Sequence, residues 1–155
     1  MKRFLFAALL LSSTSLFAQK KADDIAKLNV TTYDFGKVKQ NVPPTATIVV
    51  TNIGTEPLII EQATPSCGCT VSDYTKAPIA PGKTGTISAT YNAAAVGPID
   101  KTLTVKFAGA DDVKFVKLTG EVLTPAAFDA LKTSKESAKK LKKEKKEVTS
   151  KFIKN

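Results

Sequence analysis

An alternation of apolar and polar residues with a period of two extends over most of this chain and is clearest between Thr84 and Asn92. In that stretch one face carries Gly85, Ile87, Ala89 and Tyr91, and the other carries Thr84, Thr86, Ser88 and Thr90. Successive side chains of a β-strand point to opposite faces of the sheet, so this pattern predicts a strand with one buried and one solvated face.

Six further segments show the same pattern and are separated by turn residues. The additional predicted strands are Leu28–Phe35, Thr45–Ile53, Leu58–Ala63, Cys67–Tyr74, Lys101–Phe107 and Val113–Val122. Seven short strands within about 100 residues are typical of an immunoglobulin-like β-sandwich, an all-β fold of two packed sheets. The chain departs from the antibody pattern because it has no Trp and because its two cysteines lie only two positions apart.

The 155 residues are expected to form one domain with short extensions at both ends. Residues 1–18 combine a basic start, an apolar run and a small residue before Gln19, which predicts a signal peptide and export to the periplasm, the cell surface or the medium. We expect residues 19–27 to be a flexible, polar lead-in, residues 28–124 to form the sandwich, and residues 125–155 to form a basic helical tail.

The formal charge of +9 is concentrated in that tail. Residues 126–155 contain 10 lysines and 4 acidic residues, a net charge of +6. Thr124 can cap a helix, Pro125 can occupy its first turn, and apolar residues recur from there at spacings of three, four and seven. A C-terminal basic amphipathic helix is therefore predicted.

The tail is also the predicted contact surface. A helix of this composition suits an anionic membrane surface or a groove on an unknown protein partner, and a solvated tail is the alternative. No nucleic-acid partner is expected for an exported protein. The predicted contact residues are Phe128, Leu131, Leu141, Lys142, Lys143, Lys146 and Phe152.

The pair Cys67 and Cys69 leaves three interpretations open. On a regular strand the two side chains share a face with Cα atoms about 6.6 to 6.8 Å apart, which is the far limit for a disulfide unless Gly68 lets the chain bend. The first interpretation is two free thiols facing the core beside Val71. The second is a local, easily reduced disulfide. The third is a metal site, where copper(I) fits better than zinc because the sequence has no histidine to complete a zinc site.

Sequence motifs that imitate catalytic ones lack their context. Asp34-Phe35-Gly36 spells the magnesium-binding tripeptide of protein kinases, but no glycine loop or catalytic loop accompanies it. Gly82-Lys83-Thr84 imitates the end of a phosphate-binding loop but precedes a predicted strand instead of a helix. Without histidine no Ser-His-Asp or Cys-His arrangement can be built, so we expect a protein that is not an enzyme.

Several ordered motifs carry a resemblance to a known family. They are Asp34-Phe35-Gly36-Lys37-Val38, Thr51-Asn52-Ile53-Gly54-Thr55-Glu56-Pro57-Leu58, Ser66-Cys67-Gly68-Cys69-Thr70, Ile79-Ala80-Pro81-Gly82-Lys83-Thr84-Gly85 and Leu118-Thr119-Gly120-Glu121-Val122. Over roughly Val30 to Leu123 the chain resembles the exported bacterial family called domain of unknown function 1573. That family is similar in fold to the immunoglobulin-like domains of major sperm protein and hydin. The resemblance implies an exported sandwich and no particular reaction.

These observations together predict a non-enzymatic binding or scaffold module. Its open surfaces would be the tail and the edges of the sheets, which can accept an added strand from a partner. The alternative function is thiol redox chemistry or copper(I) handling through Cys67 and Cys69.

Overall fold

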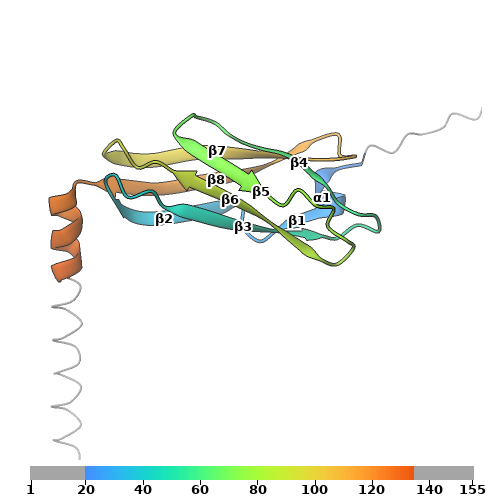
Figure 1. Cartoon of the computed structure of the whole chain (residues 1–155), viewed down its shortest axis with the longest axis horizontal. Coiled ribbons are helices and arrows are strands. Elements are labelled where there is room, and N and C mark those ends of the chain that lie inside the picture. Colours follow the sequence, from blue (N-terminus) through green and yellow to red (C-terminus); the bar gives the residue numbers. More distant parts are fainter. Residues whose placement is uncertain (1–19, 135–155) are drawn as a thin grey trace, which may run out of the picture.

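The computed structural model describes residues 20–134, which form two four-stranded β-sheets packed face to face (Figure 1). The first sheet has the order β1 (Ala26–Leu28), β3 (Thr45–Asn52), β6 (Thr84–Tyr91) and β5 (Thr70–Tyr74). The second sheet has the order β2 (Thr32–Lys39), β8 (Val113–Leu123), β7 (Gly97–Phe107) and β4 (Ile60–Pro65). The predicted signal peptide and most of the predicted tail lie outside the described residues.

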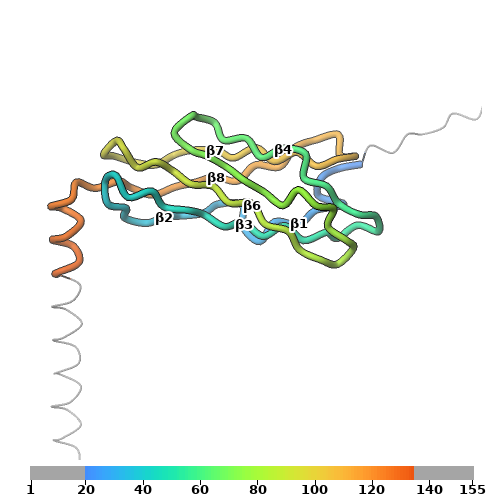
Figure 2. The backbone as a smooth tube through the Cα atoms, in the orientation of Figure 1, coloured from blue at the N-terminus to red at the C-terminus, as the bar shows by residue number. Residues whose placement is uncertain are grey.

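All neighbouring strands are antiparallel except β2 and β8, which run parallel. The first long strand therefore pairs with the last one. This pairing places residues 32–39 and 113–123, far apart in the sequence, side by side in the second sheet, as the tube in Figure 2 shows.

The core lies between the two sheets and follows the predicted alternation. β3 contributes Ala46, Ile48 and Val50, and β7 contributes Leu103, Val105 and Phe107, all fully buried. Burying one such large apolar side chain stabilises the fold by about 1.5 to 3 kcal/mol. A smaller apolar cluster around Tyr91 fills the end of the sandwich where β7 begins and β8 ends.

The structure has eight strands among its described residues where seven are predicted, because the first predicted strand is divided. β1 lies in the first sheet and β2 in the second. Asn29 makes the division: its backbone N–H donates to the Val49 carbonyl at 3.0 Å, and its side-chain oxygen accepts from the Val49 N–H at 2.8 Å. Two residues later, the Thr31 carbonyl already accepts a hydrogen bond from Lys117 of β8.

The prediction of a flexible lead-in is wrong for residues 20–27. A short helix, α1 (Ala22–Ile25), leads directly into β1, and Ala22, Ile25 and Ala26 are buried. The Asp112 carboxylate accepts a hydrogen bond from the Ala22 N–H at 2.6 Å. The segment is ordered because these apolar side chains cover one end of the core.

A buried asparagine organises the loops at the same end. Asn52 is 1% exposed. Its amide nitrogen donates to the carbonyls of Glu56 at 2.8 Å and Ile79 at 2.7 Å, and its side-chain oxygen accepts from the Gly54 N–H at 2.9 Å. Both polar atoms of the side chain are thereby satisfied, as a buried amide requires.

The predicted C-terminal helix is present over residues 125–134, at the end of the sandwich opposite α1 (Figure 1). Thr124 caps it, since its hydroxyl accepts from the Ala127 N–H at 3.3 Å. Within the described part of the chain, no helix has the length and apolar character needed to cross a bilayer.

Candidate functional site

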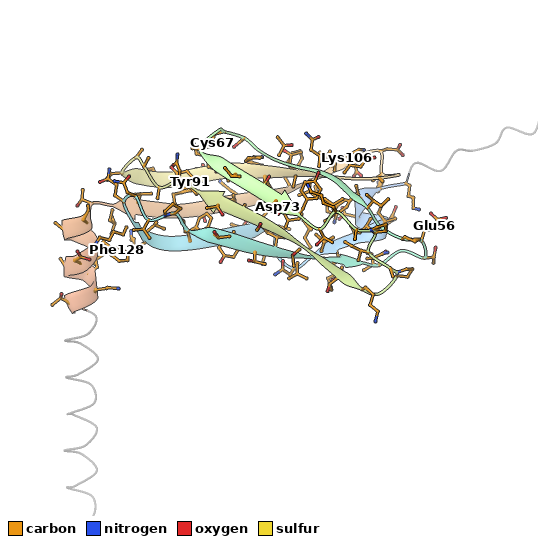
Figure 3. All side chains as sticks on the ribbon, in the orientation of Figure 1. Glu56, Cys67, Asp73, Tyr91, Lys106 and Phe128 are labelled. Atoms are coloured by element: carbon orange, nitrogen blue, oxygen red, sulfur yellow. A yellow bond between two sulfur atoms is a disulfide. The ribbon has the colours of Figure 1, made fainter. Side chains whose placement is uncertain are left out.

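The two cysteines lie in the tight turn that carries the chain from β4 of the second sheet to β5 of the first. They are joined by a disulfide with a Cα–Cα distance of 5.3 Å. The turn is closed further by the Thr70 N–H, which donates to the Cys67 carbonyl at 3.3 Å. Figure 3 shows Cys67 on the same half of the sandwich as Tyr91 and far from Glu56 at the other end.

The disulfide is half-buried and contacts the smaller apolar cluster through one of its two sulfurs. Cys69 packs against this cluster, and the Cys69 carbonyl accepts from the Asn92 N–H at 2.9 Å. The Cys67 sulfur lies 3.8 Å from the hydroxyl of Thr70. One sulfur therefore faces apolar packing, and the other has a polar neighbour.

Two sequence predictions about this pair are wrong. The cysteines do not lie on a strand, because β5 begins only at Thr70. They are not free thiols facing the core beside Val71, because the structure pairs them and Val71 is 72% exposed. In the disulfide form the sulfurs offer no thiolate to a copper(I) ion, so the copper hypothesis requires prior reduction. No cluster of three or more potential metal-binding residues of the types His, Cys, Asp and Glu occurs within residues 20–134.

An ion pair that the sequence analysis missed connects the helix of residues 125–134 to the sandwich. The Lys39 ammonium group contacts both carboxylate oxygens of Asp129, at 2.9 and 2.8 Å. The two residues are 90 positions apart, and no local pattern connects them. Only one residue, Thr124, separates the end of β8 from the helix, so the helix starts at a defined place and direction.

Two predicted contact residues come together on this helix. Phe128 is half-buried and Leu131 is 38% exposed, and both line a cavity of about 250 Å³ together with Lys37 and Lys132. The Lys132 ammonium lies 5.7 Å from the centre of the Phe128 ring. The other predicted contact residues, Leu141, Lys142, Lys143, Lys146 and Phe152, lie outside the described residues.

The four edge strands differ in how open they are. On one side of the sandwich β4 and β5 are tied together, because the Ser72 hydroxyl donates to the Ala63 carbonyl and the Tyr74 hydroxyl donates to the Glu61 carbonyl at 2.6 Å. On the other side β1 spans only three residues. Backbone N–H and C=O groups that could pair with a further strand are therefore expected on the side of β1 and β2.

An exposed ion pair lies near that side, at the end that carries α1. The ammonium of Lys114 contacts the carboxylate of Asp23, and this hydrogen-bonded cation lowers the pKa of Asp23 below its ordinary value of 3.8. The sequence analysis placed neither residue in a site, because they are 91 positions apart.

A family model described as "Protein of unknown function (DUF1573)" matches residues 26–122. This range contains the motifs that carry the resemblance and the whole sandwich except α1 and the last strand residue. No curated protein matches the chain.

Solved structures with a similar fold come from distant proteins. A protein of unknown function from Porphyromonas gingivalis W83 aligns with a TM-score of 0.56 at 17% identity, covering 71% of this chain and 51% of the other. A PapD-like domain of human CEP192 aligns at 0.53 and 10% identity, covering 79% and 99%. A family 123 glycoside hydrolase from Clostridium perfringens aligns at 0.53 and 10% identity, covering 65% and 26%.

The chain spans about half the length of the Porphyromonas protein and about a quarter of the hydrolase. At these identities the similarity shows the fold alone. It confirms the predicted immunoglobulin-like β-sandwich.

Proposed function

The chain belongs to the DUF1573 family, and we propose that it is an exported, non-enzymatic binding module that holds a partner protein against the helix of residues 125–134. The proposal is carried by one observation: this helix starts one residue after β8 and is paired with β2 through Asp129 and Lys39, yet it leaves Leu131 exposed and Phe128 only half-buried.

The contacts that fix the helix are distinct from those left available. Asp129 faces Lys39 of β2, and Thr124 caps the first turn. Phe128 and Leu131 are three residues apart and therefore share a helix face. Their cavity is an apolar contact site for a side chain of a partner.

The charges around the cavity indicate the chemistry of the partner. Lys132 and Lys37 line the cavity with the two apolar residues. Lys37 is paired with Glu121, so the positive charge offered to a partner comes from Lys132 and from the further lysines in the sequence beyond the helix. A partner surface with apolar side chains bordered by acidic residues is complementary to this arrangement. The lack of histidine in the whole sequence supports a role without acid–base catalysis.

Site-specific photocrosslinking in living cells tests the proposal. A photoreactive residue in place of Leu131 should give one discrete product with a single protein. The same residue in place of Ile53 should not, although Ile53 is the more exposed of the two. Equal products from both positions, or none from position 131, would contradict the proposal.

The alternative occupant of this helix is an anionic membrane surface, and it has its own test. The full chain and a variant lacking residues 126–155 are compared for retention on vesicles containing anionic lipid, at low and at high salt. Retention of the full chain alone, weakened by salt, would replace the protein partner with a membrane. Equal retention of the two proteins supports the protein partner.

A second candidate function is thiol redox chemistry or, after reduction, copper(I) handling by Cys67 and Cys69. The observation that favours it is the half-buried disulfide, which encloses only three residues and stands in a turn that connects the two sheets. Replacing both cysteines by serine tests it: loss of the cellular phenotype with retained folding supports this function, and an unchanged phenotype removes it.

A further inference from the structure

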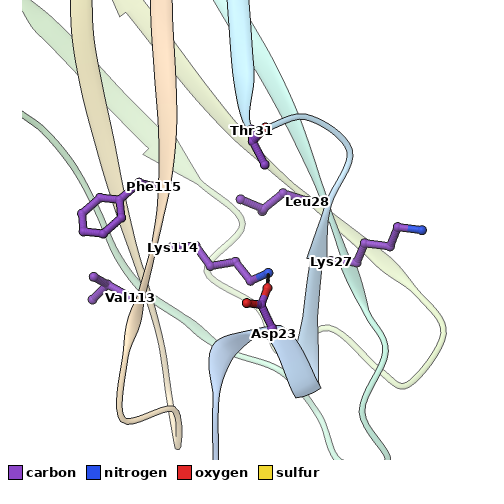
Figure 4. Close-up of a pocket in the computed structure, with 7 residues that line it drawn as sticks. All are labelled: Asp23, Lys27, Leu28, Thr31, Val113, Lys114 and Phe115. Atoms are coloured by element: carbon purple, nitrogen blue, oxygen red, sulfur yellow. Dashed lines mark hydrogen bonds and ion pairs between the residues drawn. The ribbon is translucent and has the colours of Figure 1, made fainter.

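The strand β8 extends beyond its partner β2 and leaves an unpaired edge. β2 pairs with β8 only from Lys117 to Leu123, whereas β8 begins at Val113. Along residues 113–116, β8 therefore has β7 on one side and no strand on the other. Figure 4 shows Lys114 of this segment opposite Asp23 of α1 and Leu28 of β1.

The direction of the backbone groups along this edge follows from the neighbouring hydrogen bonds. Thr102 of β7 lies opposite Lys117, and its backbone bonds away from β8: its carbonyl accepts from the Ser66 N–H at 2.8 Å, and its N–H donates to the Ser66 hydroxyl at 3.1 Å. The Lys117 N–H likewise points away from β7, to the Thr31 carbonyl at 2.8 Å. Thr102 and Lys117 are thus a non-hydrogen-bonded pair of the antiparallel ladder.

Such pairs recur at every second residue of an antiparallel ladder. The β7–β8 register has no bulge, so Phe115 and Val113 also point their N–H and C=O groups away from β7. Within residues 20–134 no group hydrogen-bonds to these backbone atoms on the open side. The backbone N–H and C=O groups of Val113 and Phe115 are therefore available to pair with a further strand.

A cavity of about 460 Å³ runs alongside this edge. Its lining residues are Asp23, Lys27, Leu28, Thr31, Val113, Lys114 and Phe115. In Figure 4 Lys114 extends from β8 toward Asp23, while Val113 and Phe115 point to the other side of the strand. Because side chains from both faces of β8 line it, the cavity lies beside the strand and not above one face. Its volume falls in the range of ligand pockets.

The lining combines apolar surface with one cation that has no ion-pair partner. Phe115 is 59% exposed. Lys114 is neutralised by Asp23, whereas Lys27 forms no ion pair with any residue in the described range. The cavity therefore has a net positive rim next to apolar side chains and unpaired backbone.

We propose that this edge takes up an extended segment of a partner protein as an added strand, in line with β2 and hydrogen-bonded to Val113 and Phe115. One side of the added strand packs apolar or β-branched side chains beside Phe115, and an acidic side chain pairs with Lys27. A folded surface or a small molecule matches the open edge less well, because only an extended backbone presents donors and acceptors at the spacing of a strand. The site is separate from the helix of residues 125–134 and goes beyond the function proposed for it.

Amide hydrogen exchange on the full chain tests the open edge first. The N–H groups of Phe115 and Val113 should exchange at least tenfold faster than those of Lys114 and Val116, which bond to β7. Equal protection of all four amides in the free protein would overturn the proposal.

The probe for binding is a set of linear ten-residue peptides selected from a random display library against the full chain. Bound peptides should protect the Phe115 and Val113 amides and should be enriched in alternating apolar residues with an acidic one. A library without binders, or binders that protect other strands, would overturn the proposal.

Variants of the full chain then separate backbone pairing from charge. Phe115→Pro removes the donor on the open side together with the aromatic ring, and Phe115→Ala removes the ring alone. The proline variant should bind the selected peptides at least tenfold more weakly than the alanine variant. Lys27→Glu replaces an exposed side chain, keeps the fold and should weaken acidic peptides at least tenfold, whereas Lys83→Glu should have no effect. Equal binding by the Lys27→Glu and Lys83→Glu variants contradicts the predicted charge pairing. Dimerisation of the full chain that Phe115→Pro abolishes would replace the partner protein with a second copy.

Discussion

Replacing Asn52 by alanine should destabilise the sandwich more than any other single polar-to-alanine change among residues 20–134. The side chain makes three hydrogen bonds, to Glu56, Ile79 and Gly54, from a position that is 1% exposed. Alanine removes all three, although the Ile79 carbonyl keeps the hydrogen bond that it accepts from the Leu58 N–H at 2.8 Å. The backbone bonds of Asn52 itself to Lys83 and Gly82 do not depend on the side chain.

The magnitude follows from these bonds. Each intramolecular hydrogen bond contributes about 1 kcal/mol net. The loss of three bonds should therefore cost about 3 kcal/mol of unfolding free energy, a large fraction of the roughly 5 to 15 kcal/mol typical of a small domain. For a domain of this size the corresponding fall in Tm is about 12 °C.

Urea unfolding followed by far-UV circular dichroism measures the change. Asn92→Ala is the matched control, because Asn92 is exposed and its side chain accepts only one bond, at 3.3 Å. The control should lose less than about 1 kcal/mol. A loss for Asn52→Ala no larger than that of the control would refute the reasoning.

The aspartate variant adds a pH signature. In Asn52→Asp a buried carboxylate would face the carbonyls of Glu56 and Ile79, so burial and repulsion raise its folded-state pKa above the ordinary value. The folded state then binds the proton more tightly than the unfolded state. The stability of this variant should consequently rise, relative to that of Asn52→Ala, as the pH falls from 7 toward 4.

Three further predictions concern other parts of the sandwich. Gly120→Ala should cost about 1 to 3 kcal/mol in urea unfolding, because the new Cβ would lie 3.0 Å from the backbone oxygen of Gly36 and the φ of +153° disfavours any side chain. Reduction of the Cys67–Cys69 disulfide should lower the unfolding free energy by less than about 2 kcal/mol, because the enclosed loop is so short, and a loss of the folded signal on reduction would contradict this. Asp23→Asn should reduce the acid sensitivity of Tm: the lowered pKa of Asp23 means that its lysine pair stabilises the fold above pH 3.8 and is lost as the pH falls below it, so Tm measured at pH 6 and pH 3 should differ less in the variant.

The long strands could be predicted from the sequence because their pattern is local. Within residues 46–50 of β3, 85–91 of β6 and 103–107 of β7 every second residue is apolar, and the predicted inward residues Ile48, Ile87 and Leu103 are all fully buried. An alternation of seven or eight residues has only one arrangement that places all its apolar side chains inside. The cap at Thr124 was predictable for the same reason, since it depends on residues only three apart.

The lead-in could not be predicted because its signal is too short. α1 contains four residues, and among them only Ala22 and Ile25 are buried. A periodic pattern needs a window of about 11 to 18 residues to distinguish a helix from a polar loop. The bond from Ala22 to Asp112, across 90 positions, supplies the order that no local window contains.

The sequence predicts a strand at β5, but it does not predict which side chains of that strand point inward. Apolar Val71 favours an inward position, yet Val71 is exposed and Thr70 is buried. Residues directly opposite in an antiparallel pair share a face, and the register places Thr70 opposite Tyr91 and Val71 opposite Thr90. Since Tyr91 points inward, Thr70 must do so too, and the apolar side chain is turned to solvent. The register between β5 and β6 therefore decides which side chains of β5 point inward, against the preference of Val71 alone. A shift of one position would turn every side chain of the strand to the other face.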